Sequence, residues 1–365
     1  MGFNCGIVGL PNVGKSTLFN AVTNTTAAAA ANYPFCTIEP NVGRVPVPDP
    51  RLETLARLGA SAKTVPTQLE IKDIAGLVRG ASKGEGLGNK FLGAIREVDA
   101  VLEVLRCFED ADVTHVEGSV DPLRDAELVE TELLLADLES LERQRDGLVR
   151  RARGPDKDAK ARLQLLERVT PEMEAGRQAR ALELSEDERS LLGGFTLLTA
   201  KPILYICNVD ETSAATGNTL SERVAAMAVA QGAGHVVICA AIEAELSALS
   251  EDEKAEYLAG MGLAEPGLNR VIRAGHELLG LLTFFTVGPK EARAWTVHRG
   301  ATAPQAAGVI HTDFERGFIC AEVIGYDDFV RLGGEQGARD QGRMRLEGRD
   351  YVVQEGDVCH FRFNV

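Results

Sequence analysis

The chain has 365 residues, of which 45% are hydrophobic and 25% are charged, and a formal net charge of −15 at pH 7. This length predicts about two or three domains, and the composition is that of an ordinary soluble globular protein. The negative charge excludes a protein that binds polyanions over its whole surface, and the lack of a long apolar run or a signal-peptide pattern indicates no membrane span.

The first motif is a phosphate-binding loop between a strand predicted at 3–8 and a helix that begins at 17–22. Residues 9–16 read Gly-Leu-Pro-Asn-Val-Gly-Lys-Ser and match the pattern G-x-x-x-x-G-K-[ST]. A strand, a glycine turn and a helix N-terminus together direct backbone N–H groups toward an anion. The motif therefore predicts a nucleoside triphosphate site, formed here by Asn12, Val13, Gly14, Lys15, Ser16 and Thr17.

Two side chains of the loop have specific predicted roles. Lys15 is expected to reach the β- and γ-phosphates and to neutralise charge in catalysis, and the Ser16 hydroxyl is expected to bind Mg²⁺. Further along the chain, Thr37 lies between two prolines in the segment 33–40. We expect Thr37 to close over Mg²⁺ and the γ-phosphate. The alternative is an incidental hydroxyl in a structural loop.

A second γ-phosphate contact is predicted at the end of a strand over 67–73. Asp73 starts a D-x-x-G motif that ends at Gly76. Asp73 is expected to hold Mg²⁺ through water, and the Gly76 amide is expected to contact the γ-phosphate. The order of the three motifs along the chain strengthens the interpretation of each.

The residue after this motif departs from the usual pattern. Ras-like enzymes carry a glutamine there that orients the attacking water, whereas this chain has Leu77, whose side chain forms no hydrogen bond. Hydrolysis is therefore expected to be slow, to use another group, or to need a partner. His115 is a candidate for that group, and the alternative is a structural or solvent-exposed histidine. Asn12 is a second candidate, through a bound K⁺ that neutralises charge.

A base-recognition motif follows a strand predicted at 201–207. Guanine-specific proteins have Asn-Lys-x-Asp there, and this chain has Asn-Val-Asp-Glu at 208–211. Glu211 is one methylene longer than aspartate and Val209 is shorter than lysine, so the paired bonds to guanine are weakened. Adenine then becomes acceptable, with Asn208 near its N6/N7 edge.

Two neighbouring features modify this base pocket. Asp210 lies one residue early and offers a second carboxylate to the base. After a strand predicted at 235–239, Ala240 and Ala241 occupy the position of a loop whose backbone contacts the base. The strands at 3–8, 67–73, 99–106, 201–207 and 235–239 alternate with helices and predict a doubly wound α/β domain over 1–125 and 196–281.

The interval 126–195 reads as an inserted helical hairpin. Its leucines recur at spacings of three, four and seven residues, and Gly154-Pro155 separates the two runs. Between 143 and 162 the chain has eight basic and three acidic residues, a local net charge of +5. This basic tip is interpreted as a nucleic-acid contact through Arg150, Arg151 and Arg153 or, equally, as a solvated helix end.

The last segment, 282–365, predicts a small mixed β domain. Short runs of strand formers at 283–287, 293–297, 318–323, 351–353 and 360–363 are separated by turns, with a helix near 303–310. The arrangement resembles a ubiquitin-like grasp. The fold class is therefore α/β, a P-loop NTPase G domain with an inserted helical hairpin and a C-terminal ubiquitin-like α+β domain.

Taken in order, these motifs resemble the YchF / Obg-like ATPase family of translation-factor-related P-loop proteins. The resemblance covers essentially the whole chain and identifies the last segment with a TGS domain. It implies an OBG-type G domain, a preference for ATP over GTP, slow hydrolysis, and binding to ribosomes or ribosomal subunits. One departure is Glu103, at a position where the family often has histidine.

Three functional hypotheses follow. The first is a Mg²⁺-dependent ATPase that acts as a ribosome-associated switch in translation or stress regulation, with the basic tip and the TGS-like domain facing rRNA. The second is a nucleotide-gated RNA- or ribosome-binding protein with incidental hydrolysis, and the third is a GTPase. Seven scattered cysteines, none in a C-x-x-C, fit a cytoplasmic location.

Overall fold

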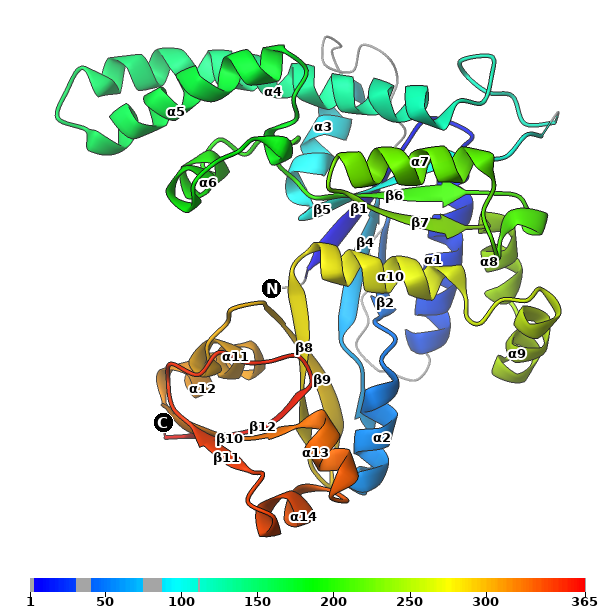
Figure 1. Ribbon diagram of the computed structural model, residues 1–365, viewed down its shortest axis with the longest axis vertical. Helices are drawn as coiled ribbons and strands as arrows, with labels where there is room; N and C mark the ends of the chain where they lie inside the picture. Colours follow the sequence, from blue (N-terminus) through cyan, green and yellow to red (C-terminus); the bar gives the residue numbers. More distant parts are fainter. Residues whose placement is uncertain (1–2, 31–40, 75–86, 111, 365) are drawn as a thin grey trace. The chain divides into compact units, whose positions relative to one another are not determined.

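The computed structural model describes residues 3–30, 41–74, 87–110 and 112–364 (Figure 1). It divides into two compact units. The first comprises Met1–Val45 and Glu70–Gly275, and the second comprises Pro46–Leu69 and His276–Val365. None of the helices within the described ranges is long and apolar enough to cross a membrane.

A six-stranded sheet forms the centre of the first unit, in the order β2-β4-β1-β5-β6-β7. Its strands are β1 (Asn4–Val8), β2 (Val42–Pro46), β4 (Gln68–Asp73), β5 (Ala100–Arg106), β6 (Ile203–Asn208) and β7 (Gly234–Ile238). All five strands predicted from the sequence are present, and β2 is an additional one. The pairs β1–β4, β1–β5, β5–β6 and β6–β7 are parallel, which confirms the α/β class.

Helices connect and cover these strands. They are α1 (Lys15–Ala30), α3 (Leu87–Glu97), α7 (Thr219–Ala230), α8 (Ala240–Leu246), α9 (Glu251–Gly260) and α10 (Gly267–Leu278). Every residue of the central strands β5 and β6 is buried. Parallel strands covered on both faces need near-continuous apolar sequence, and both strands fit this rule except where Glu103 interrupts β5.

Glu103 is an ionisable group inside the apolar sheet. In the strand register it lies between Val8 of β1 and Tyr205 of β6. It is fully buried, and its two carboxylate oxygens have no hydrogen-bond partner among the described residues. Burial raises the pKa of Glu103 well above its usual 4.5, and the carboxylate of Glu130 adds to the rise. Glu103 is therefore expected to keep its proton in the folded chain.

The Glu103→Gln variant is expected to be more stable than the wild type at neutral pH. Above pH 4.5 the unfolded chain releases the Glu103 proton while the folded chain keeps it, which favours unfolding. The wild type thus loses about 1.4 kcal/mol of unfolding free energy per pH unit until the folded group ionises. Urea unfolding from about pH 5.5 to 7.5 should show that the difference in unfolding free energy between Glu103→Gln and the wild type increases with pH. A difference that stays constant with pH, as expected for the exposed control Glu97→Gln, would contradict the raised pKa of the buried Glu103.

The inserted segment forms a helical arm, as predicted, but with a third helix. Its elements are α4 (Pro122–Ala152), α5 (Lys157–Glu174), η1 (Ala179–Ala181) and α6 (Glu186–Gly193). The turn at Gly154-Pro155 separates α4 from α5, and Asp156 caps α5 by accepting from the Ala159 amide at 3.0 Å. The seam between α4 and α5 also packs against Leu192 and Phe195. The predicted hairpin of α4 and α5 is therefore present, and α6 and the segment after it extend its apolar core.

The second unit is built on a mixed sheet in the order β11-β10-β12-β8-β9-β3. Its strands are β3 (Thr64–Val65), β8 (Leu281–Val287), β9 (Ala292–His298), β10 (Phe318–Gly325), β11 (Arg345–Glu347) and β12 (Asp357–Phe363). Its helices are α2 (Pro50–Leu58), α11 (Ala303–Ile310), α12 (Thr312–Arg316), α13 (Tyr326–Arg331) and α14 (Glu335–Asp340). The α+β character is confirmed, with one exception: 351–353 forms a single bridge from Val352 to Thr302 and not a strand.

The segment 46–69 belongs to this second unit and not to the nucleotide-binding unit, where the sequence analysis placed it. Leu52, Leu55 and Ala56 of α2 pack into the same core as Phe285. The Arg51 guanidinium donates to Glu355 at 2.5 Å, and β3 pairs with β9. The sequence boundary at 282 was therefore incomplete, since these long-range contacts add an early segment to the C-terminal fold.

Candidate nucleotide site

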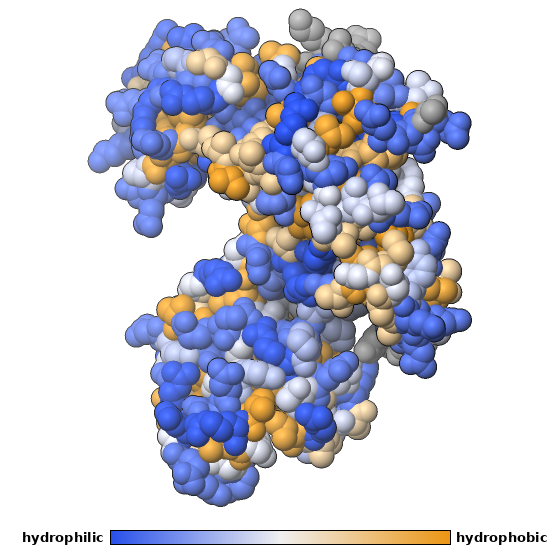
Figure 2. All heavy atoms as spheres, turned by 45° about the vertical axis from the view of Figure 1, so that its right-hand side comes forward, coloured by the Kyte–Doolittle hydropathy of each residue, from blue (hydrophilic) through white to orange (hydrophobic). Residues whose placement is uncertain are grey.

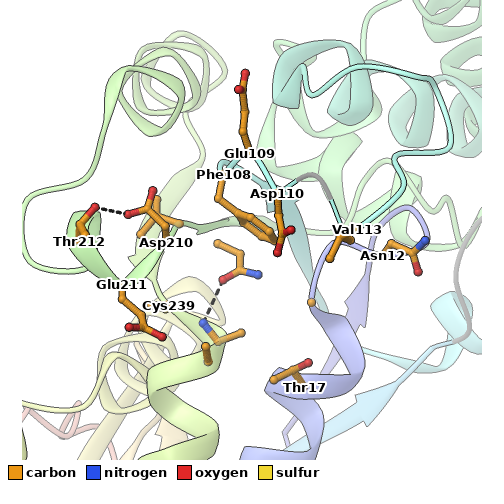
Figure 3. Close-up of a pocket in the computed structure, with 15 residues that line it drawn as sticks. Asn12, Thr17, Phe108, Glu109, Asp110, Val113, Asp210, Glu211, Thr212 and Cys239 are labelled. Carbon is orange, nitrogen blue, oxygen red and sulfur yellow. Dashed lines mark hydrogen bonds between the residues drawn. The ribbon is translucent and has the colours of Figure 1, made fainter.

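A pocket of about 620 Å³ opens at the carboxyl ends of the central strands (Figure 3). This is the edge where open parallel sheets bind ligands, and the volume lies within the usual range for small-molecule sites. The lining comes from the phosphate loop, from the loops after β5 and β6, and from the start of α8. The lining residues are Asn12, Gly14, Thr17, Phe108, Glu109, Asp110, Val113, Asn208, Val209, Asp210, Glu211, Thr212, Cys239, Ala240 and Ala241.

The phosphate loop has the backbone that its glycines predict. Gly9 and Gly14 have φ angles of 143° and 99°, in the region that favours glycine. A Cβ atom at Gly9 would lie 2.5 Å from the carbonyl oxygen of Val104 on β5. Asn12 also has a positive φ of 62°, and its Nδ2 donates to the Thr114 carbonyl at 3.1 Å. The loop is therefore fixed against β5 and against the segment that follows it.

Lys15 is buried beside the pocket with its charge held close to the loop. Its Nζ donates to the Leu10 carbonyl at 2.6 Å. Burial lowers the pKa of Lys15 to about 8, while the nearby Asp73 carboxylate acts in the opposite direction. Burial raises the pKa of Asp73, opposed by Lys15. At neutral pH Lys15 is thus still mainly charged, and a phosphate group entering the loop would favour that form.

Ser16 and Asp73 are the described residues that fit a Mg²⁺ ion. Ser16 is exposed in the first turn of α1, and Asp73 ends β4 opposite Ile7 of β1. Mg²⁺ prefers oxygen ligands and keeps several waters and substrate phosphates, so a hydroxyl and a carboxylate are a fitting protein contribution. Thr37 and Gly76, the other two predicted γ-phosphate and metal contacts, lie outside the described residues.

The side chain of Asn208 links the phosphate loop to the start of α8. Its Nδ2 donates to the Val13 carbonyl at 2.9 Å, and its Oδ1 accepts from the Ala240 amide at 2.9 Å. The predicted contact of this amide with the N6/N7 edge of a base is therefore weakened, because both ends of the amide already hold the phosphate loop against α8. This frame places Ala240 and Ala241 at the pocket, as the sequence analysis expected.

The two carboxylates after β6 differ in availability. Asp210 accepts from the Ser213 amide at 3.0 Å and the Thr212 hydroxyl at 2.5 Å, and these bonds lower its pKa. Asp210 caps the short turn η2 (Glu211–Ser213). Its carboxylate is therefore already bonded within the turn and is less available to a base than the sequence analysis allowed. Glu211 is exposed, whereas Val209 is buried, and both residues line the pocket.

One wall of the pocket was not predicted. Phe108, Glu109, Asp110 and Val113 follow β5 and line the side opposite Asp210 and Glu211. In Figure 3 the Phe108 ring points into the pocket, whereas Glu109 points away from it. The position of an aromatic residue just after a buried strand was the available signal, since parallel strands end at the ligand edge. Cys239 and Thr212, at the far side, were also missed.

His115 lies near this wall but does not line the pocket. It is buried, and its Nε2 is 2.8 Å from Asp125 Oδ2 on α4. Its Nδ1 accepts from the Glu117 amide at 3.1 Å. Both ring nitrogens therefore have protein partners, an arrangement that favours the structural alternative in this conformation.

The basic tip is exposed at the end of the arm. Arg150, Arg151 and Arg153 are all exposed, and Arg151 pairs with Asp156 at 2.9 Å. Hydrophilic residues predominate over the arm, at the upper left of Figure 2. Of the three arginines, Arg151 is thus partly committed to the turn between α4 and α5, and Arg150 donates from its Nε to the Asp146 carbonyl of its own helix at 3.3 Å.

Comparison with known proteins identifies a GTPase-type domain at the N-terminal end and a YchF C-terminal domain. A family model described as a 50S ribosome-binding GTPase matches residues 4–141, and the model YchF-GTPase_C, described as a protein of unknown function, matches residues 281–364. The chain is 58% identical to the "Ribosome-binding ATPase YchF" of Haemophilus ducreyi, with both chains fully covered. This chain belongs to the YchF family. The proteins of the same name in Escherichia coli O157:H7 and Bacillus subtilis are 54% and 50% identical, again over both full lengths.

A solved YchF structure has the same fold. The YchF GTPase of Schizosaccharomyces pombe superimposes with a TM-score of 0.89 at 36% identity, covering 99% of this chain and 98% of that chain. The bacterial YchF proteins are named as ATPases and the yeast protein as a GTPase. The names of these relatives therefore differ in the nucleotide that they give.

Proposed function

We propose that this YchF chain is a slow ATPase that acts as a ribosome-associated nucleotide switch in the cytoplasm. The observation that carries the proposal is the base end of the pocket, which combines the phosphate loop with Val209 and an exposed Glu211 in place of the lysine and aspartate of guanine-specific proteins. The names of its bacterial relatives support both ATP and the ribosome.

The chain's own residues provide binding and electrostatic stabilisation. Backbone amides at the start of α1 and the Lys15 ammonium neutralise the phosphates. Ser16 and Asp73, with Thr37 from the predicted loop, would hold Mg²⁺, which would stabilise the charge on the transferred phosphoryl group. The amide of Gly76 is the proposed γ-phosphate sensor. A K⁺ ion held near Asn12 remains a prediction.

The base preference is tested by calorimetry with non-hydrolysable ATP and GTP analogues and Mg²⁺. The wild type is expected to bind the ATP analogue about tenfold more tightly, a difference of about 1.4 kcal/mol. The Val209→Lys/Glu211→Asp variant should shift toward GTP because it restores the paired acceptor and the longer stem. Since Val209 is buried, Glu211→Asp alone and a melting curve serve as controls. A wild type that prefers GTP would contradict the ATPase assignment.

Water activation by His115 remains a proposal that requires a conformational change. In the described conformation both ring nitrogens are bonded, so His115 must exchange a partner to reach a water near the γ-phosphate. If it does so, His115→Ala should lower kcat by about 100-fold with little change in ATP affinity. If its role is structural, His115→Ala and Asp125→Asn should both lower the melting temperature and leave kcat at the wild-type value.

A nucleotide-gated binding protein with incidental hydrolysis is the second candidate. Leu77 favours it, because no glutamine follows the D-x-x-G motif to orient water. Stimulation of ATP turnover by purified ribosomes would support the switch and oppose this alternative. Equal turnover with and without ribosomes would favour the alternative.

A further inference from the structure

The unpredicted wall of the pocket is held by one buried side chain, Arg106. It is the last residue of β5, is 1% exposed, and is not among the residues that line the pocket. Its Nε donates to the Phe108 carbonyl at 3.1 Å, its Nη1 to the Val113 carbonyl at 2.8 Å, and its Nη2 to the Asp110 carbonyl at 3.1 Å. All three acceptors belong to residues that line the pocket.

The same guanidinium also contacts the ring of Phe108. The Arg106 Cζ atom lies 4.7 Å from the ring centroid, a cation–π distance. Phe108 is therefore restrained at both its carbonyl and its ring. Burying a guanidinium is costly unless its donors are satisfied, and here three of its nitrogens are used on one short stretch of backbone.

The wall is also joined to the phosphate loop. Asn12 donates to the carbonyl of Thr114, which is next to Val113 in the chain. Arg106 and Asn12 thus fix neighbouring carbonyls of one segment, one from the strand and one from the loop. A nucleotide bound by its phosphates would meet the Phe108 ring at a defined position.

We propose that Arg106 is the positioning residue for the purine base, and that it acts by fixing Phe108 as a stacking surface. The inference rests on the proposed function, in that it assumes a nucleoside triphosphate in this pocket. Arginine suits the role because its planar fork directs five donors outward. A lysine ammonium keeps the charge but, from a single nitrogen, does not reach three carbonyls spread over the wall.

The experiment compares a ligand that has a base with one that has none. Affinities for a non-hydrolysable ATP analogue and for inorganic tripolyphosphate, both with Mg²⁺, are measured for the full-length wild type, Arg106→Lys and Phe108→Ala. We expect both variants to bind the ATP analogue about tenfold more weakly, the equivalent of one good contact. Tripolyphosphate affinity should not change, and in turnover KM should rise while kcat stays constant.

The double variant tests whether the two residues act together. If Arg106 works through Phe108, Arg106→Lys/Phe108→Ala should be no weaker than the worse single variant. Arg349→Lys is the matched control, since Arg349 also donates to a phenylalanine carbonyl, that of Phe318, at 3.1 Å and lies 5.9 Å from the centroid of the same ring, whereas Phe318 does not line the pocket. Melting curves accompany every variant, and Phe108→Ala keeps the Arg106 bonds should Arg106→Lys fold poorly.

The outcomes separate this inference from the proposed function. Equal loss of both ligands in Arg106→Lys would mean that Arg106 only supports the fold, and no loss of either would mean that the wall does not contact the base. Each result overturns the inference. A wild type that prefers GTP would overturn the ATP assignment, yet the same contrast measured with a GTP analogue would still support Arg106. A wild type that binds tripolyphosphate as tightly as ATP and GTP analogues would overturn both.

Discussion

The Lys15→Ala variant is expected to lose ATP turnover by about 100-fold or more, the usual loss when one pre-positioned charge at a reacting phosphate is removed. Lys15 is buried, so its charge acts where water screens little, and the bond from its Nζ to the Leu10 carbonyl holds it in the loop. ATP binding should weaken as well, because the ground state already carries the phosphate charge. Phosphate release and calorimetry measure the two effects.

Lys72→Ala is the matched control for this prediction. Lys72 precedes Asp73 on β4, but its side chain is 25% exposed and lies 3.9 Å from Glu97. The Lys72→Ala substitution removes one positive charge, as Lys15→Ala does, but from β4 and not from the phosphate loop. Turnover at the wild-type rate in Lys15→Ala would show that the nucleotide site has been wrongly assigned.

Reversing charges at the arm tip is expected to produce the second large effect, on binding to ribosomes or RNA. The sequence analysis named Arg150, Arg151 and Arg153. Since Arg151 pairs with Asp156, its reversal would place two acids together and disturb the turn. Arg150→Glu/Arg153→Glu/Lys157→Glu therefore tests the surface with less damage. We expect cosedimentation to fall by about tenfold or more and the salt dependence to lose about one unit of slope per phosphate contact.

An equal change of net charge elsewhere controls for long-range repulsion. Lys90→Glu/Arg96→Glu/Arg189→Glu reverses three exposed basic side chains of the same unit outside the tip. If both triple variants lose binding equally, the effect is one of net charge. If neither does, the tip is only a solvated helix end, the alternative that the sequence left open.

The phosphate loop was predictable because its conformation is set locally. The glycines at 9 and 14 have backbone angles that other residues avoid, and they recur at a fixed spacing before a helix. The proposed roles of Lys15, Ser16 and Asp73 follow from that spacing and from the order of strands. The place of Asn208 in the pocket was also foreseen, but not that both ends of its amide are used internally.

The Phe108 wall was not predictable in the same way. It has no regular secondary structure, and its shape depends on three bonds from Arg106 to carbonyls at 108, 110 and 113. No local pattern marks such bonds, because any residue supplies a carbonyl. The placement of residues 46–69 in the C-terminal unit was not predicted for a related reason. The apolar face of α2 shows that it packs against something, but its partner Phe285 is far away in the chain.

That distance has a consequence during synthesis. The apolar face of α2 emerges early, whereas β8 begins at Leu281, more than 220 residues after α2 ends at Leu58. At typical elongation rates of about 5–20 residues per second, this interval lasts roughly 10–45 s. Throughout it, Leu52 and Leu55 lack the core that later buries them. The nucleotide-binding unit is therefore synthesised while α2 still lacks its core, and a nascent chain stopped before β8 would leave the apolar face of α2 exposed.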